Sequence, residues 1–269
     1  MSLPPFIPTI GDEARAVIAE KLAEIEASEG VRVLFAVESG SRAWGFPSPD
    51  SDYDVRFVYV HHREWYLSLM PGRDVIELPI AEDLDINGWD IRKALNLMLK
   101  PNPVMLEWLS SPIRYRWDEE ACAALCGLAA RVAHQTACRH HYLSLGEGQW
   151  RKHVGDAEQV NYKKYFYILR PALTLRWLRL VPDHLPPMNL QALVAGLDLE
   201  QDIVSLITEL LERKARAKEV GSGPRIAEVD GLILSEFDLA RQLPTLTSDP
   251  GHGEVATRLF RALVEATHS

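Results

Sequence analysis

The stretch ESGSRAWGFPSPDSDYDVRFVYV, residues 38–60, decides the fold that this chain is expected to adopt. Residues 31–40 and 53–60 are rich in β-branched and aromatic side chains, which predicts two buried strands. The segment between these strands is rich in Gly, Pro, Ser and Asp, as loops are. Asp52 and Asp54 are two positions apart where the second strand begins, so their side chains are expected to share one side of it.

Outward from this stretch, the pattern changes from strands to helices along the chain. Residues 74–80 and 82–88 predict two more strands, whereas 11–29, 63–69, 89–100 and 103–111 predict helices. Beyond these, helical patterns cover 118–133, 136–149, 158–180, 199–219, 230–242 and 253–267. We therefore expect an α+β fold, with a strand-rich domain at residues 1–115 and a helical domain at residues 116–269.

The composition excludes several classes of protein. The 269 residues include 29 Lys and Arg against 38 Asp and Glu, a net charge of −9, and 47 % are hydrophobic, which is enough for a core. We see no apolar run of ~18 residues and no secretory signal, so a membrane protein is not expected. Three cysteines without zinc-type spacing favour a cytoplasmic protein with no disulfide-linked partner. The cysteines are Cys122, Cys126 and Cys138.

Paired carboxylates at Asp52 and Asp54 indicate a metal site. Two like charges held together are unfavourable unless a cation joins them, and carboxylate oxygens suit Mg²⁺ or Mn²⁺ bound to substrate phosphates. A third acid should come from a neighbouring strand, and Asp85 lies between two apolar residues in a strand-like run. Asp90 is the alternative, although its place before a helix is typical of an N-terminal cap.

These motifs together resemble a known superfamily. Gly40-Ser41, ten residues, Asp52-Tyr53-Asp54 and a later hydrophobic–Asp–hydrophobic at 84–86 are similar to the DNA polymerase beta type nucleotidyltransferases. The phrases SGSRAWGF, DINGWDIRKALNLMLKPNPVMLEWLSSPIRY and YKKYFYILRPALTLRW resemble predicted nucleotidyltransferases of the YcgL-like or RlaP type, which are associated with RNA-repair genes. The resemblance implies a nucleotidyltransferase domain with a mixed sheet, followed by an all-helical domain that contributes to the nucleotide and acceptor cleft.

The resemblance also implies roles for individual residues. Gly40 and Ser41, with the adjoining Arg42, are expected to contact the triphosphate of a nucleotide, for which ATP is favoured. Asp52 and Asp54 are expected to hold Mg²⁺ or Mn²⁺. Asp85 is expected to bind a second ion or to help deprotonate the attacking hydroxyl group.

A basic stretch in this acidic chain supplies further candidates. Residues 151–180 hold seven Lys and Arg against two acids, and Lys163, Tyr167 and Arg170 fall on one face of a predicted helix. A solvated helix face is the usual meaning of such a run. The alternative is that Lys163 and Arg170 contact phosphates and Tyr167 contacts a base.

The function expected from these features is metal-dependent transfer of a nucleoside monophosphate from an NTP to a hydroxyl group, with release of pyrophosphate. An RNA end is the favoured acceptor, and a protein or a small molecule is the alternative. A different possibility is an antitoxin-like or partner-binding regulator that uses this fold to recognise, or to adenylylate, another protein. A third is a metal-dependent phosphohydrolase.

Overall fold

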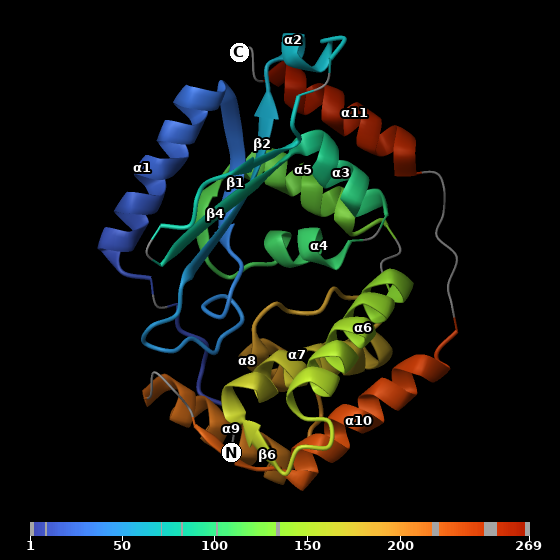
Figure 1. The fold of residues 1–269 in the computed structure, drawn as a ribbon. Helices are drawn as coiled ribbons and strands as arrows, with labels where there is room; N and C mark the ends of the chain where they lie inside the picture. Colours follow the sequence, from blue (N-terminus) through green and yellow to red (C-terminus); the bar gives the residue numbers. More distant parts are fainter. Residues whose placement is uncertain are drawn as a thin grey trace. The chain divides into compact units, whose positions relative to one another are not determined.

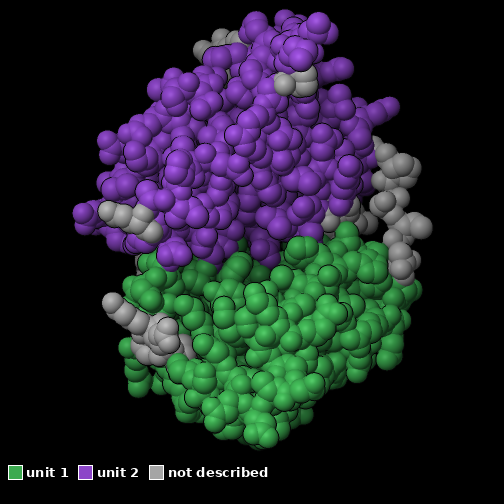
Figure 2. Space-filling view, in the orientation of Figure 1, with its two compact units in different colours: residues 1–7, 41–51, 135–247 green, residues 8–40, 52–134, 248–269 purple. Residues whose placement is uncertain are grey.

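The computed structural model describes residues 3–8, 10–70, 72–81, 83–100, 102–132, 135–216, 221–244 and 252–266. The chain divides into two units that are not consecutive in sequence (Figure 2). Unit 1 comprises Met1–Ile7, Ser41–Ser51 and Gln135–Thr247, and unit 2 comprises Pro8–Gly40, Asp52–His134 and Ser248–Ser269. The boundary expected near residue 115 falls inside unit 2, so the division into domains at that point stays a prediction.

Unit 2 is built on a five-stranded sheet in the order β3-β4-β2-β1-β5. The strands are β1 (Val31–Glu38), β2 (Tyr53–His61), β3 (Val75–Glu77), β4 (Leu84–Asp90) and β5 (Arg114–Trp117). β2 and β4 are parallel and the other pairs are antiparallel, which confirms the α+β class with a mixed sheet. The short β5 was not expected from the sequence; it pairs with the Phe35–Val37 part of β1.

Helices cover both faces of this sheet. They are α1 (Asp12–Glu29), α2 (Arg63–Tyr66), α3 (Ile91–Leu99), α4 (Pro103–Leu109), α5 (Glu119–Ala129) and α11 (His252–Glu265). α1 buries Ile18, Leu22 and Ile25 in one core with the strands, while Figure 1 shows α3 and α5 on the other side. The helix predicted from residue 89 begins two residues later than expected, because Asp90 ends β4 and caps α3.

Unit 1 is mainly helical. Its helices are α6 (Gln135–His153), α7 (Tyr162–Leu180), α8 (Leu190–Ala195), α9 (Gln201–Arg216) and α10 (Ala227–Gln242). A two-stranded pair, β6 (Gln159–Asn161) with β7 (Ser222–Pro224), was not expected in this part of the chain. The predicted helical ends at 133, 217–219 and 267 lie outside the described residues. Within the described ranges, no helix combines the length and apolar character needed to cross a bilayer.

The 41–51 loop (Ser41–Ser51) connects two strands of unit 2 but belongs to unit 1. Its aromatic side chains explain this assignment. Phe46 is 2 % exposed and stacks on Phe166 of α7, with the ring centroids 5.0 Å apart. Trp44 meets Tyr167 of the same helix edge-on at 6.0 Å. The buried Phe46 ring and the half-buried Trp44 ring stabilise the loop against the helices of unit 1.

Candidate functional site

The parallel pairing of β2 with β4 brings two of the predicted acids together. Asp54 of β2 is the register partner of Asp85 of β4, so the carboxylates lie side by side at one end of the sheet. Arg56 lies two residues beyond Asp54, on the same side of β2. Its Nη2 is 2.7 Å from Asp85 Oδ2 and 3.4 Å from Asp54 Oδ1. This arginine was missed in the sequence, although the two-residue strand period from Asp52 and Asp54 points to it.

The charges in this group act on one another. Burial raises the pKa of the Asp54 carboxyl above its ordinary value, and the nearby Arg56 opposes that shift. The charges of Asp85 and Asp52 raise the same pKa, so both of the other predicted acids act on Asp54. Asp52 itself is exposed, just before the first residue of β2.

Gly40 allows the backbone to approach the Asp54 carboxylate. A Cβ atom at position 40 would lie 1.7 Å from Asp54 Oδ2, closer than real atoms come. The backbone of the preceding residue is fixed to the same strand, since Ser39 N–H donates to Asp54 O at 2.9 Å. Glycine therefore fits here because a larger side chain would have no room beside the Asp54 carboxylate, and not because the backbone has a positive φ.

Glu38, the last residue of β1, is a buried acid that the sequence analysis did not single out. It is fully buried, and its carboxylate accepts hydrogen bonds from Asp54 N–H and from the Tyr115 hydroxyl. Burial is the main cause of the raised pKa of Glu38. Its contacts fix the backbone of Asp54, and a charged residue that ends an otherwise apolar strand was the signal available in the sequence.

Asp90, the rival for the third acid, lies at the other end of β4. Its register partner is Tyr59, whereas Asp85 pairs with Asp54. Five strand residues correspond to about 16 Å. Asp90 is 1 % exposed and accepts hydrogen bonds from Arg92 N–H at 2.8 Å and from the Tyr66 hydroxyl at 2.7 Å. It therefore acts as a buried helix cap.

The donor chemistry of the acids fits a divalent cation. Asp52, Asp54 and Asp85 offer carboxylate oxygens, the ligands that Mg²⁺ and Mn²⁺ prefer, and their mutual repulsion at Asp54 is what a cation would relieve. In the arrangement shown here, the Arg56 guanidinium supplies positive charge to two of them. Over the described ranges, no group of three or more His, Cys, Asp or Glu side chains is gathered closely enough to hold a metal ion.

The predicted nucleotide contacts Ser41 and Arg42 close the ends of the 41–51 loop. Ser41 Oγ donates to Ser51 Oγ at 2.9 Å, and Arg42 Nη2 donates to the Ser51 carbonyl at 2.6 Å. Arg42 is only 9 % exposed. Both residues belong to unit 1, whereas Gly40 and the three acids belong to unit 2.

The three predicted residues of α7 also lie in unit 1. Tyr167 contacts the rings of Trp44 and Phe46 in the 41–51 loop. Arg170 is 4 % exposed, lies over the Trp44 ring at 5.0 Å and donates to the Met188 carbonyl, so its guanidinium supports the loop from inside unit 1. Lys163 is half-buried in the first turn of α7. Contact of these residues with a nucleotide stays a prediction.

Lys214 of α9 is a third residue that the sequence analysis missed. It is 1 % exposed, and its ammonium group donates to the carbonyl of Phe46 in the 41–51 loop. The signal was its position: it continues the apolar face formed by Ile203, Ile207 and Leu210 at helical spacing. A lysine at such a position is rarely buried without a specific partner.

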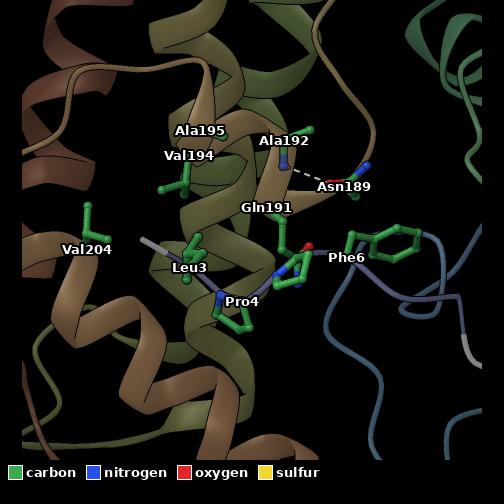
Figure 3. Close-up of a pocket in the computed structure, with 10 residues that line it drawn as sticks. Leu3, Pro4, Phe6, Asn189, Gln191, Ala192, Val194, Ala195 and Val204 are labelled. Carbon is green, nitrogen blue, oxygen red and sulfur yellow. Dashed lines mark hydrogen bonds between the residues drawn. The ribbon is translucent and has the colours of Figure 1, made fainter. Parts of the chain in front are cut away.

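A cavity of about 420 Å³ also lies in unit 1 (Figure 3). The N-terminal residues Leu3, Pro4 and Phe6 line it together with Val194 of α8 and Val204 of α9. Among the described residues that line it there is no charged side chain, and so none of the cationic groups that bind a triphosphate.

Comparison with known proteins gives three findings. The sequence profile of the RNA repair pathway DNA polymerase beta family matches residues 14–262. The uncharacterized protein YcgL of Bacillus subtilis (strain 168) is 43 % identical over 224 residues, which is 82 % of this chain and 84 % of that protein. The crystal structure of a nucleotidyltransferase-like protein from Exiguobacterium sibiricum 255-15 aligns over 85 % of this chain and 74 % of its own, with 12 % identity and a TM-score of 0.28.

Proposed function

Because the chain belongs to the RNA repair pathway DNA polymerase beta family, as its motifs led us to expect, we propose that it is a metal-dependent nucleotidyltransferase. It transfers a nucleoside monophosphate from an NTP, ATP in our proposal, to a hydroxyl group and releases pyrophosphate. The acceptor that we favour is an RNA end, in keeping with the name of the family.

One observation supports this proposal above the others. Asp54 and Asp85 are register partners on parallel strands, and Gly40 leaves room for the Asp54 carboxylate beside the backbone. This arrangement concentrates negative charge where a cation and a phosphate are needed. Asp52, immediately before β2, adds to the field at Asp54.

Each residue has a role in the proposed reaction. Asp52, Asp54 and Asp85 would hold Mg²⁺ or Mn²⁺, which supplies charge neutralisation at the transferred phosphate and at the leaving pyrophosphate. Ser41 and Arg42 bind the triphosphate. The acceptor oxygen attacks the α-phosphorus, the bond to the β-phosphate oxygen breaks, and the hydroxyl proton passes to a carboxylate, for which Asp85 is our choice.

Transfer of label from each NTP labelled on its α-phosphate tests the proposal. The reactions contain Mg²⁺ or Mn²⁺ and an RNA with a free 3′ hydroxyl, or a protein acceptor. Label is expected on the acceptor, with equimolar pyrophosphate. The double variant Asp54→Asn/Asp85→Asn is expected to be slower by about a thousandfold. Asp74→Asn, which changes an exposed acid paired with Lys93, is the matched control.

Two results would contradict the proposal. Undiminished transfer by the double variant would show that the acids are not needed. Release of inorganic phosphate without any labelled acceptor would instead indicate a phosphohydrolase.

One observation favours the second candidate function, a partner-binding regulator. Arg56 forms ion pairs with both Asp54 and Asp85 in this structure, and binding of another protein would not require these pairs to break. Leu67, Leu69 and Met70 are 68 %, 94 % and 78 % exposed, and exposed apolar side chains suit protein contacts. A biological effect that persists in Asp54→Asn/Asp85→Asn would support the regulator over the enzyme.

A further inference from the structure

The 41–51 loop is held through three successive backbone carbonyls, each of which accepts a hydrogen bond from a different donor in the helical part of unit 1. The pairs, donor first, are Leu190 N with Trp44 O at 2.9 Å, Gln191 Nε2 with Gly45 O at 2.6 Å, and Lys214 Nζ with Phe46 O. Gly45 has a φ of +85°, and a Cβ there would lie 1.9 Å from Gln191 Oε1. These hydrogen bonds therefore hold the backbone in the middle of the loop in one conformation against α8 and α9.

Lys214 is the least expected of these donors. Its ammonium lies 4.5 Å from the Phe46 ring centroid, 5.5 Å from that of Phe166 and 5.8 Å from that of Tyr167. It forms no ion pair with a carboxylate of the described part of the chain. The ring faces and the Phe46 carbonyl are the attractive contacts that offset the loss of hydration.

Burial of this charge is unfavourable, which indicates a role beyond packing. Desolvation, together with the charges of Lys163 and Lys164, lowers the pKa of Lys214 to about 7, and Asp50 opposes the shift. A methionine or leucine would continue the apolar face of α9 without that cost. The lysine is therefore best explained by what it holds, the carbonyl of Phe46.

The contact extends to the predicted nucleotide residues by hydrogen bonds inside the loop. Phe46 N–H donates to Ser41 O at 3.1 Å, so the residue that Lys214 holds is bonded directly to the start of the loop. Ser51 completes the closure, since it accepts from Ser41 and Arg42. A displacement of Phe46 is therefore transmitted to Ser41 and Arg42 through hydrogen bonds within the loop.

We propose that Lys214 is a positioning residue: it fixes the 41–51 loop in the conformation that presents Ser41 and Arg42 to the triphosphate. This inference rests on the function proposed above. Lys214 itself, being buried, touches no reacting atom. Its loss should weaken nucleotide binding more than it slows the bound reaction, so the effect falls on KM rather than on kcat.

Hydrogen exchange of the backbone amides of the 41–51 loop, followed by mass spectrometry, tests this role together with titration by ATP and Mg²⁺. Lys214→Met keeps the length of the side chain but removes the donor. We expect exchange in the loop to be about tenfold faster, and ATP affinity about tenfold weaker, as for loss of one charge-assisted hydrogen bond. Lys214→Arg should restore both. Arg216→Met, at an exposed position of the same helix, is the matched control and should change neither.

The exchange arm decides the proposal independently of the enzyme activity. Wild-type exchange in a folded Lys214→Met variant would overturn it, and so would faster exchange with unchanged ATP affinity. If Lys214→Met does not fold, Lys214→Gln, which is shorter and uncharged, must show the faster exchange instead. A wild-type protein that binds no NTP would count against the proposed function, and loop exchange would still show whether Lys214 orders the loop.

Discussion

Replacement of Gly40 by alanine is expected to act on the site through one atom of Asp54. The new Cβ would lie 1.7 Å from Asp54 Oδ2 and 2.6 Å from its Cγ. Heavy atoms essentially never approach closer than 3.0 Å in this way, so the carboxylate must retreat by about 1.3 Å, the difference between the two distances. The backbone itself has no reason to change, because residue 40 does not have a positive φ.

The loss of stability in Gly40→Ala depends on how far the Asp54 carboxylate can rotate away from the new Cβ atom. The side chain of Asp54 is 33 % exposed, so it can rotate toward solvent. We therefore expect a loss of about 1 kcal/mol in the free energy of unfolding, the low end for overpacking, and a fall in Tm of about 3 °C. Nucleotidyl transfer should fall by about a hundredfold, as expected for a displacement of about 1 Å at a reacting centre.

Thermal unfolding and the label-transfer assay measure these two effects. Gly127→Ala is the matched control: it lies on an exposed face of α5 in the same unit, and a Cβ placed there would meet no neighbouring atom within 4 Å. It should leave transfer unchanged and raise stability by about 0.5–1 kcal/mol, as alanine does in a helix. Since Gly40→Ala acts through Asp54, combining it with Asp54→Asn should add little to the single variant. Wild-type transfer by Gly40→Ala, or full additivity in the double variant, would refute the reasoning.

Three other predictions concern the remaining charges. Burial lowers the pKa of His61 to about 4, so the free energy of unfolding should be highest above pH 6.5 and should fall as the pH drops toward 4. At pH 4.5, urea unfolding should show a loss of about 2 kcal/mol relative to pH 7. This loss should be absent in His61→Phe and present in the control His140→Gln. Arg56→Met should lower the free energy of unfolding of the metal-free protein by about 1 kcal/mol. Mg²⁺ should raise the Tm of this variant more than that of the wild type. An equal rise in Tm for both proteins would argue against cation binding at Asp54 and Asp85. Glu236→Gln removes a carboxylate that is 2 % exposed and lies between two arginines of α7, so the free energy of chemical unfolding should fall by about 3 kcal/mol. The control Glu212→Gln, at an exposed position, should lower it by about 0.5 kcal/mol or less.

Much of unit 2 could be predicted from local patterns. The apolar runs at 31–40 and 53–60 are strands, and the hydrophobic–Asp–hydrophobic pattern at 84–86 does place Asp85 beside Asp54. These features follow from strand period and sequence order. β5 could not be found in this way, because four residues after a proline carry too short a pattern and its pairing with β1 is set by the tertiary fold.

The residues that were missed depend on contacts between distant parts of the chain. Nothing local to Lys214 indicates that its partner is the carbonyl of Phe46, and nothing local to Arg170 indicates that its guanidinium lies over Trp44. A helical pattern tells which face is apolar but not which loop lies on it. The sequence placed Arg170 on one helix face with Lys163 and Tyr167 but did not indicate that its side chain is buried.

The 41–51 loop also sets a condition on how the protein is made. The carbonyl that Lys214 holds comes 168 residues earlier in the chain. At a synthesis rate of about 5–20 residues per second, roughly ten to thirty seconds pass between the emergence of Phe46 and that of its partner. In the first part of that interval, before α7 emerges, the strands on either side of the loop can pair, while Phe46 and Trp44 lack the α7 rings that they contact. A ribosome that stops before α7 would therefore release a chain with an exposed apolar loop, a natural target for chaperones and proteases.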